Sequence, residues 1–125
     1  MAKDSFSNGY ALLIGVSDNL IANYALPTVA RDAAALHKVL IHPKRCAYPA
    51  ENVRLLTGSD ASRDGIYAGL SWLKERIAAD RSDNVTAVLF YSGHGVVNNE
   101  DKSYYLLPYD LRSPIIDSLL PASDV

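Results

Sequence analysis

Three short apolar runs alternate with two amphipathic stretches along the chain. The runs are continuous and end at turn-forming residues, which is typical of strands buried on both faces. They cover residues 10–16, 53–57 and 85–91. Between them, apolar residues recur at helical spacing over residues 29–40 and again over residues 66–77. The pattern predicts the order β-α-β-α-β, followed by an irregular tail in which residues 104–107 are a short extended segment.

Local signals mark the ends of these elements. Pro27 and Thr28 precede the first helix, where Thr28 is a candidate cap, and Pro43 prevents the helix from continuing. Ser62 is a candidate cap for the second helix. Gly15 and Gly58 are interpreted as turn residues.

Alternating strands and helices predict a parallel sheet with right-handed crossovers and helices packed on its faces. In such sheets the active groups lie at the carboxyl ends of the strands. Those ends are followed by residues 17–24 and 92–103, so we look for chemistry in these two loops.

Composition restricts the class of protein. The chain has 125 residues, of which 49% are hydrophobic and 21% charged, and its net charge is −2, which is typical of one packed domain without affinity for nucleic acid. No apolar run approaches the roughly 20 residues of a membrane span, and the N-terminus lacks a signal-peptide core. The single cysteine forms no internal disulfide, and with three histidines it makes no zinc set. We expect a cytoplasmic protein that binds neither nucleic acid nor membrane.

His94 is the strongest candidate for chemistry. It stands between Gly93 and Gly95, directly after the third apolar run. The glycines allow a sharp turn and a close approach to a substrate. An imidazole can take a proton from a nucleophile and return it to a leaving group. By position alone, a solvent-exposed histidine in a glycine-rich turn is an equal alternative.

The segment Phe-Tyr-Ser-Gly-His-Gly at residues 90–95 resembles the Tyr-Ser-Gly-His-Gly signature of the caspase and metacaspase cysteine peptidases, including the bacterial orthocaspases. Further segments agree with the family in order and spacing, and together they span nearly the whole chain: residues 10–16, 30–33, 48–53, 72–73 and 105–110. The resemblance implies that residues 1–125 are the large-subunit portion of a caspase-like domain. Its fold would be an α/β three-layer sandwich with a mostly parallel sheet, incomplete in this chain.

The resemblance also implies a cysteine endopeptidase with a Cys-His dyad. In this family a thiolate attacks the peptide carbonyl, the histidine acts as acid and base, and backbone N–H groups stabilise the oxyanion. By position, His94 is the dyad histidine and the Gly95 amide is an oxyanion donor. The cysteine should follow the histidine by about 50 positions, beyond Val125, whereas Cys46 is interpreted as a structural or surface thiol. We therefore expect a companion Cys-bearing polypeptide or fragment, and an inactive chain without it.

Asp32 and Ser92 are the candidate substrate-binding residues. Asp32 lies in the first turn of the first helix, where the helix dipole by itself favours a carboxylate. Metacaspases and orthocaspases have an acidic residue here in the primary specificity pocket, whereas animal caspases, which cleave after Asp, carry an Arg six residues earlier. This chain has Leu26 at that earlier position. With Ser92 beside His94, the resemblance implies protein or peptide substrates cleaved after Arg or Lys.

Other interpretations remain open. The acidic loop at residues 98–101 could hold calcium, as in some metacaspases, although a polar loop tip is the commoner explanation, and no other cofactor or metal is expected. An alternative function is a catalytically inactive caspase-like module that binds or regulates a partner, against which the presence of Asp32, Ser92 and His94 argues. A flavodoxin-like or nucleotide-binding domain fits the strand order but lacks a phosphate-binding loop.

Overall fold

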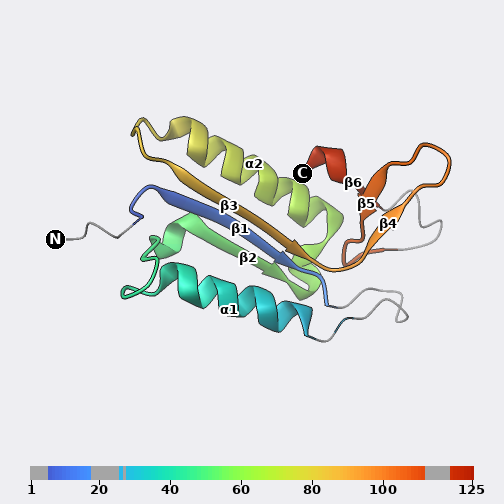
Figure 1. The fold of residues 1–125 in the computed structure, drawn as a ribbon, viewed down its shortest axis with the longest axis horizontal. Helices are drawn as coiled ribbons and strands as arrows, with labels where there is room; N and C mark the ends of the chain where they lie inside the picture. The colour runs from blue at the N-terminus through green and yellow to red at the C-terminus, as the bar shows by residue number, and fades with distance from the viewer. Residues whose placement is uncertain (1–5, 18–25, 27, 112–118) are drawn as a thin grey trace.

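The computed structural model describes residues 6–17, 26, 28–111 and 119–125. Three parallel strands form the main sheet in the order β2-β1-β3. The strands are β1 (Gly9–Gly15), β2 (Val53–Thr57) and β3 (Thr86–Ser92). The helices α1 (Val29–Ile41) and α2 (Arg63–Ala79) lie on opposite sides of this sheet (Figure 1). The predicted α/β sandwich with a small, incomplete parallel sheet is confirmed.

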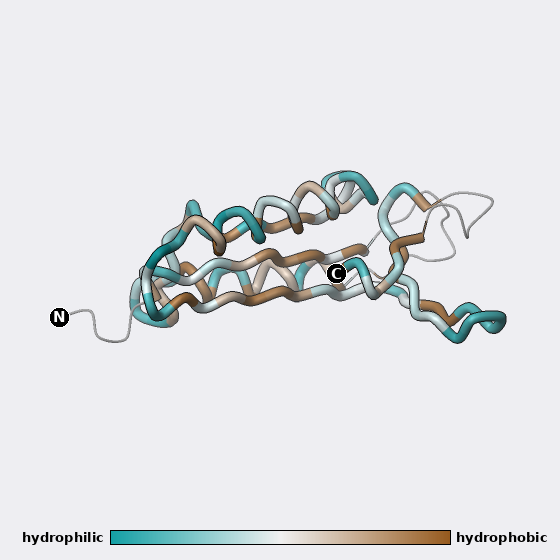
Figure 2. Tube along the Cα trace, turned by 90° about the horizontal axis from the view of Figure 1, so that it is seen from above, coloured by the Kyte–Doolittle hydropathy of each residue, from teal (hydrophilic) through white to brown (hydrophobic). Residues whose placement is uncertain are grey.

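The central strand β1 forms the middle of two hydrophobic clusters. Leu12 and Ile14 pack on the side of α2, while Ala11 and Leu13 pack on the side of α1, and all four are fully buried. Figure 2 shows the apolar stretches of the chain concentrated in the strands that run between the helices. Burial on both faces explains why β1 reads as a continuous apolar run rather than an alternating one.

The start of α1 corrects the predicted cap. The side chain of Thr28 makes no capping hydrogen bond. Instead Ser17, just beyond the end of β1, accepts a hydrogen bond from the Ala30 N–H through its Oγ at 2.6 Å. The cap thus comes from a neighbouring strand, because the buried Ser17 hydroxyl lies against the first turn of the helix.

The start of α2 follows the sequence more directly. The Ser62 Oγ accepts a hydrogen bond from the Gly65 N–H at 3.0 Å, so the predicted cap is confirmed. The one-turn helices η2 (Ala50–Asn52) and η3 (Gly58–Ala61) precede β2 and α2. Among the helices that the structure describes, none has the length and apolar character to cross a membrane.

Gly15 and Gly58 turn out to have different roles. Gly58 has a φ of +56°, a conformation that favours glycine, so its assignment to a turn is confirmed. Gly15 is instead the last residue of β1, and the turn interpretation is wrong. A Cβ on Gly15 would lie 3.0 Å from the Ala33 Cβ and 3.1 Å from the Val29 carbonyl oxygen, so its missing side chain lets α1 approach the sheet.

The tail after β3 is more regular than predicted. It forms a second, antiparallel sheet with the order β4-β5-β6, at the end of the molecule where the main strands finish (Figure 1). Its strands are β4 (Gly95–Val97), β5 (Tyr104–Leu106) and β6 (Leu120–Pro121), and the short helix η4 (Ala122–Asp124) follows. A small cluster of buried leucines supports it, formed by Leu107, Leu111 and Leu119. Such short strands carry too little periodic sequence to be recognised as a sheet.

The first two turns of α2 attach this tail to the main sheet. The Arg63 N–H donates to Asp110 Oδ1 at 2.8 Å, and its Nε donates to the Leu119 carbonyl at 3.3 Å. One turn further along, the Tyr67 hydroxyl donates to Asp124 Oδ2 at 2.6 Å. The antiparallel sheet is therefore held against the carboxyl end of the parallel one.

Candidate functional site

The candidate site lies at the carboxyl edge of the main sheet, where three segments meet. The Val16 N–H donates to the Ser92 carbonyl at 2.9 Å, which joins the end of β1 to the end of β3. Ser17 in turn contacts Ala30 in the first turn of α1. The ends of β1 and β3, the start of α1 and the start of β4 therefore lie at one end of the molecule (Figure 1). Of the predicted loop 17–24, residues 18–24 lie outside the described residues.

His94 occupies the short connection between β3 and β4 and is partly exposed. Its carbonyl oxygen accepts a hydrogen bond from the Leu107 N–H at 3.1 Å. The hydroxyl of Tyr91 lies 2.9 Å from the same oxygen. The backbone at the histidine is therefore held both from β3 and from the end of β5.

The Tyr91 side chain links the two sides of this connection. Its hydroxyl lies 3.0 Å from the Leu107 carbonyl oxygen as well as 2.9 Å from that of His94, so its one proton faces two acceptors. Burial raises the pKa of Tyr91 to about 12. The phenol consequently stays protonated, and remains a donor, throughout the pH range in which enzymes work.

The glycines beside His94 have distinct surroundings. A Cβ on Gly93 would lie 2.7 Å from the Tyr91 hydroxyl oxygen and 3.2 Å from the Val16 Cβ, so only glycine leaves room for the phenol. Gly95 is exposed, and the nearest atom to a Cβ there would be the Tyr105 carbonyl oxygen at 3.5 Å. Gly93 is thus needed for packing, whereas the space around Gly95 is open.

The structure brings the four predicted site residues to the same edge of the sheet. Ser92 ends β3 and is partly buried, and His94 and Gly95 follow within three residues. Asp32 lies in the first turn of α1 with an exposed side chain. Leu26, at the position where the animal enzymes carry Arg, donates its N–H to the Ser17 carbonyl oxygen at this edge.

Cys46 lies at the opposite edge. It follows the end of α1, its N–H donates to the Val39 carbonyl at 3.4 Å, and its side chain packs against the cluster on the α1 face. His94 is beyond the other end of β1, which is seven residues long. At about 3.3 Å per residue in a strand, the length of β1 separates the two side chains by roughly 20 Å. This cysteine and this histidine do not form a dyad.

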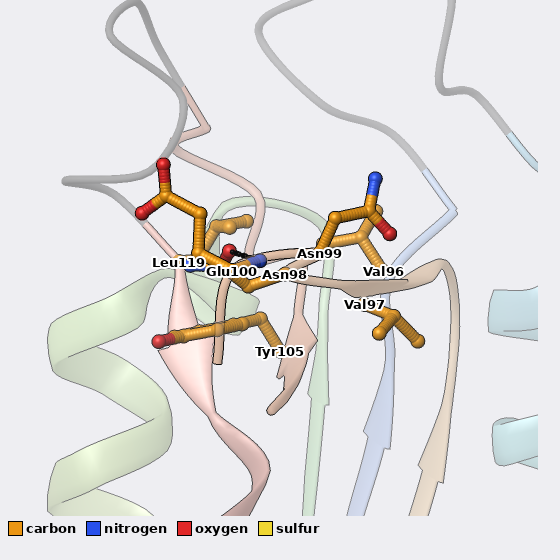
Figure 3. Close-up of a pocket in the computed structure, with 7 residues that line it drawn as sticks. All are labelled: Val96, Val97, Asn98, Asn99, Glu100, Tyr105 and Leu119. Carbon is orange, nitrogen blue, oxygen red and sulfur yellow. Dashed lines mark hydrogen bonds between the residues drawn. The ribbon is translucent and has the colours of Figure 1, made fainter. Parts of the chain in front are cut away.

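An open pocket of about 490 Å³ lies on the β4–β5 hairpin rather than at the histidine. Its lining is Val96, Val97, Asn98, Asn99, Glu100, Tyr105 and Leu119. In Figure 3 the ring of Tyr105 lies below the hairpin tip, while the Asn99 and Glu100 side chains point away from that ring. The pocket therefore does not include the residues that the signature singles out.

The acidic loop that suggested calcium uses its oxygens internally. Asn98 Oδ1 accepts the Glu100 N–H and Asp101 Oδ1 accepts the Ser103 N–H, both at 2.9 Å. Within the part of the chain that the structure describes, no three His, Cys, Asp or Glu side chains gather into a group that could hold a metal ion.

The family-model comparison agrees with the signature and its position in the fold. The model of the caspase domain matches residues 8–124, which is nearly the whole chain. The chain belongs to the caspase-domain family of cysteine peptidases. The search of curated proteins finds no significant match. The matched range includes residues 90–95, whose backbone contacts are described above.

Two residues at the site were missed by sequence reasoning. The sequence places Tyr91 in the third apolar run and the signature, and Ser17 in the loop after the first run, and neither pattern indicates an anchoring role. Their partners are His94, Leu107 and Ala30, of which two are more than ten positions away. A polar hydroxyl at the end of an otherwise apolar strand is the one signal in the sequence that could have indicated them.

Proposed function

We propose that this chain is the large-subunit part of a cysteine endopeptidase that cleaves peptide bonds after Arg or Lys. His94 acts as general acid and base, and the Gly95 amide donates to the oxyanion. Asp32 and Ser92 bind the side chain before the scissile bond. The nucleophilic cysteine comes from a companion polypeptide or fragment. The observation that carries the proposal is the position of the signature histidine at the carboxyl edge of the sheet, in a chain of the caspase-domain family.

The separation of Cys46 from His94 supports a nucleophile that comes from elsewhere. A dyad needs the sulfur and the imidazole within hydrogen-bonding reach, about 3 Å to 4 Å, and the length of β1 lies between these two residues. Cys46 is the single cysteine of the chain. The thiolate must therefore reach the carboxyl edge on another segment.

The outer side of β3 supports the companion. Among the described strands, β3 pairs with β1 alone, so its other edge presents backbone N–H and C=O groups without a neighbouring strand. Leu89 in the middle of β3 is 42% exposed. An apolar strand with an open edge is a site for pairing with a further strand. A strand carrying the cysteine would reach the edge beside His94 from this position.

The exposed carboxylate of Asp32 supports a basic side chain at the cleavage site. Arg binds a carboxylate with two parallel hydrogen bonds, and Lys binds it as a point charge. The family-type alternative, an Arg that would select acidic substrates, is absent because position 26 is Leu. Asp32→Asn keeps the shape and removes the charge, so it tests the specificity directly.

The test is to express the chain with the downstream part of its gene and to assay peptides ending in Arg, Lys or Asp. We expect a Cys-bearing polypeptide to copurify and cleavage to follow Arg and Lys. Asp32→Asn should raise KM for both basic peptides, and Asp64→Asn, an exposed first-turn carboxylate of α2, is the matched control. The inactive, partner-binding module would be supported instead by a different result: the chain purifies with a partner that lacks the nucleophilic cysteine, and it cleaves none of the three peptides.

A further inference from the structure

We propose that Tyr91 is a positioning residue for the oxyanion hole: its hydroxyl orients the peptide unit between His94 and Gly95 so that the Gly95 N–H faces the substrate. The inference rests on the proposed function, because it concerns the donor assigned to Gly95. It adds a residue that neither touches the substrate nor belongs to the dyad.

The first step is the geometry of one peptide bond. The carbonyl of His94 and the N–H of Gly95 belong to the same planar trans unit and point in opposite directions. The His94 oxygen accepts the Leu107 N–H at 3.1 Å, and it shares the single proton of the Tyr91 hydroxyl, 2.9 Å away, with the Leu107 carbonyl. Fixing this oxygen toward β3 and β5 therefore directs the Gly95 N–H away from them.

The hydrogen-bond pattern between β4 and β5 independently gives the same direction for the Gly95 N–H. In an antiparallel pair, residues alternate between those bonded to the neighbouring strand and those whose N–H and C=O point outward. The Leu107 N–H donates to the His94 carbonyl at 3.1 Å, and the Asn98 N–H donates to the Ser103 carbonyl at 2.9 Å. His94 and Asn98 are therefore in the set that bonds to β5. Gly95, one position after His94, is in the outward set. Its N–H thus faces the free side of β4.

A tyrosine at position 91 is suited to hold the peptide unit between His94 and Gly95, because its ring and its hydroxyl are both fixed. The ring packs in the cluster on the α2 face of the sheet, beside Leu12 and Ile14. The hydroxyl reaches past Gly93, whose missing side chain provides the space. The same hydroxyl also contacts the Leu107 carbonyl at 3.0 Å, so it links the tail to the histidine connection.

Misplacing the Gly95 N–H should affect kcat and not KM. An oxyanion donor acts on the tetrahedral intermediate and not on the ground-state peptide, so it raises kcat with little effect on substrate binding. Removing such a donor costs about 100-fold to 1,000-fold in kcat. In Tyr91→Phe the donor remains and only one of its two anchors is lost. We expect kcat to fall by about tenfold, with KM unchanged.

The test compares two inhibitors on the chain assembled with its Cys-bearing companion. A peptide aldehyde ending in Arg adds the cysteine sulfur to its carbonyl carbon, and the thiol proton passes to the new hydroxyl, which occupies the oxyanion position. The matching peptide alcohol binds without forming this bond. Tyr91→Phe should weaken the aldehyde by about tenfold and leave the alcohol unchanged. A structural defect would weaken both.

The matched control is Tyr10→Phe, which removes the same hydroxyl from the other end of the sheet, where it donates to Asp80 at 2.6 Å. It should leave the ratio of aldehyde to alcohol affinity unchanged. Tyr91→para-fluorophenylalanine gives a second variant that fills the ring position without a donor, and it should match Tyr91→Phe. In the chain itself, the His94 carbonyl ¹³C and Gly95 amide ¹⁵N resonances should shift in Tyr91→Phe but not in Tyr10→Phe.

The outcomes separate the two proposals. If the assembled wild-type protein cleaves no peptide, or if His94→Ala retains activity, the proposed function fails. If His94→Ala is inactive while Tyr91→Phe keeps the wild-type ratio of aldehyde to alcohol affinity, the proposed function stands and the role of Tyr91 is refuted. Unchanged His94 and Gly95 resonances in Tyr91→Phe would refute it as well.

Discussion

The two ends of the main sheet use the same kind of side chain for different purposes. At the amino edge, the Tyr10 hydroxyl and the Asn8 amide both donate to the carboxylate of Asp80, at 2.6 Å and 3.0 Å. At the carboxyl edge, the hydroxyls of Tyr91 and Ser17 bond to backbone groups. Side chains at the first edge hold one another, whereas those at the second hold the main chain in place.

The difference explains where chemistry can occur. Both tyrosine rings pack against the hydrophobic cluster on the α2 side of the sheet. At the amino edge the network joins Asn8 and Tyr10, at the start of β1, to Asp80, just after α2. At the carboxyl edge the Tyr91 and Ser17 hydroxyls bond to backbone groups next to the residues that we propose for catalysis. Four predictions test this division.

The largest difference is expected between His94→Ala and Cys46→Ala. General acid–base catalysis contributes about 100-fold to 10,000-fold, so the histidine variant should lose kcat/KM on that scale in the assembled protein. Cys46 lies at the amino edge, and its replacement should leave kcat/KM unchanged. A comparable loss in Cys46→Ala would contradict the separation of the two edges. Steady-state cleavage of an Arg-ending peptide measures both.

Gly93→Ala should be the most destabilising change at the carboxyl edge. The new Cβ would lie 2.7 Å from the Tyr91 hydroxyl oxygen and 3.0 Å from its ring carbon Cζ. Such overpacking costs about 1–3 kcal/mol in the free energy of unfolding. In the Tyr91→Phe background the closest contact is gone, so the cost should drop by about 1 kcal/mol. Equal costs in both backgrounds, measured by urea unfolding, would show that the phenol is not the obstacle.

Ser17→Ala and Thr28→Ala should differ although both residues flank α1. The Ser17 hydroxyl caps the helix through the Ala30 N–H, and losing a cap of this kind costs about 1 kcal/mol. Thr28 makes no capping bond, and its side chain is exposed, so its replacement should leave the unfolding free energy unchanged. Thermal or urea unfolding of the two variants is the measurement. A larger loss of unfolding free energy in Thr28→Ala than in Ser17→Ala would support Thr28, the cap predicted from the sequence.

The smallest effect concerns pH at the amino edge. Hydrogen bonds from Tyr10, Ser82 and Asn8 hold the pKa of Asp80 well below its usual value of 3.8, and the bond to Asp80 raises the pKa of Tyr10 above 10.0. A lowered carboxyl pKa stabilises the fold above pH 3.8 and is lost as the pH falls toward the folded value. A raised tyrosine pKa stabilises the fold below pH 10.0 and is lost as the pH rises past it.

Asp80→Asn should therefore lower the unfolding midpoint between about pH 5 and pH 9, and the difference from wild type should shrink at pH 3 and below. Asp83→Asn removes an exposed carboxylate of the same loop for which the structure shows no hydrogen bond, and it should behave as wild type. A difference between Asp80→Asn and wild type that persists undiminished at pH 2 would mean that the ionised carboxylate is not what stabilises this edge.

Much of the main sheet could be predicted because its signals are local. The strand at 53–57 has the predicted bounds, and the strands around residues 10–16 and 85–91 differ by one residue at each end. Helix α1 ends at Ile41, before Pro43, as expected. Apolar runs and helical spacing are properties of consecutive residues, and burial in the sandwich then follows from them.

The second sheet and the cap of α1 could not be predicted in the same way. The strand β5 confirms the extended segment predicted at residues 104–107, but β4 and β6 have three and two residues, too few for a periodic pattern. The cap of α1 depends on Ser17, which reaches the helix only because the end of β1 lies against it. Thr28 has the residue type and the position of a cap but not the hydrogen bond.

The sequence alone determined the α/β order, the caspase-type signature around His94 and the absence of a second cysteine. These depend on residue types and spacings along the chain. Only the tertiary structure decided that Cys46 and His94 lie at opposite ends of β1, and that Tyr91 and Leu107 hold the His94 carbonyl. Contacts of that kind join residues from different elements, and their geometry exists only once the strands and helices have packed together.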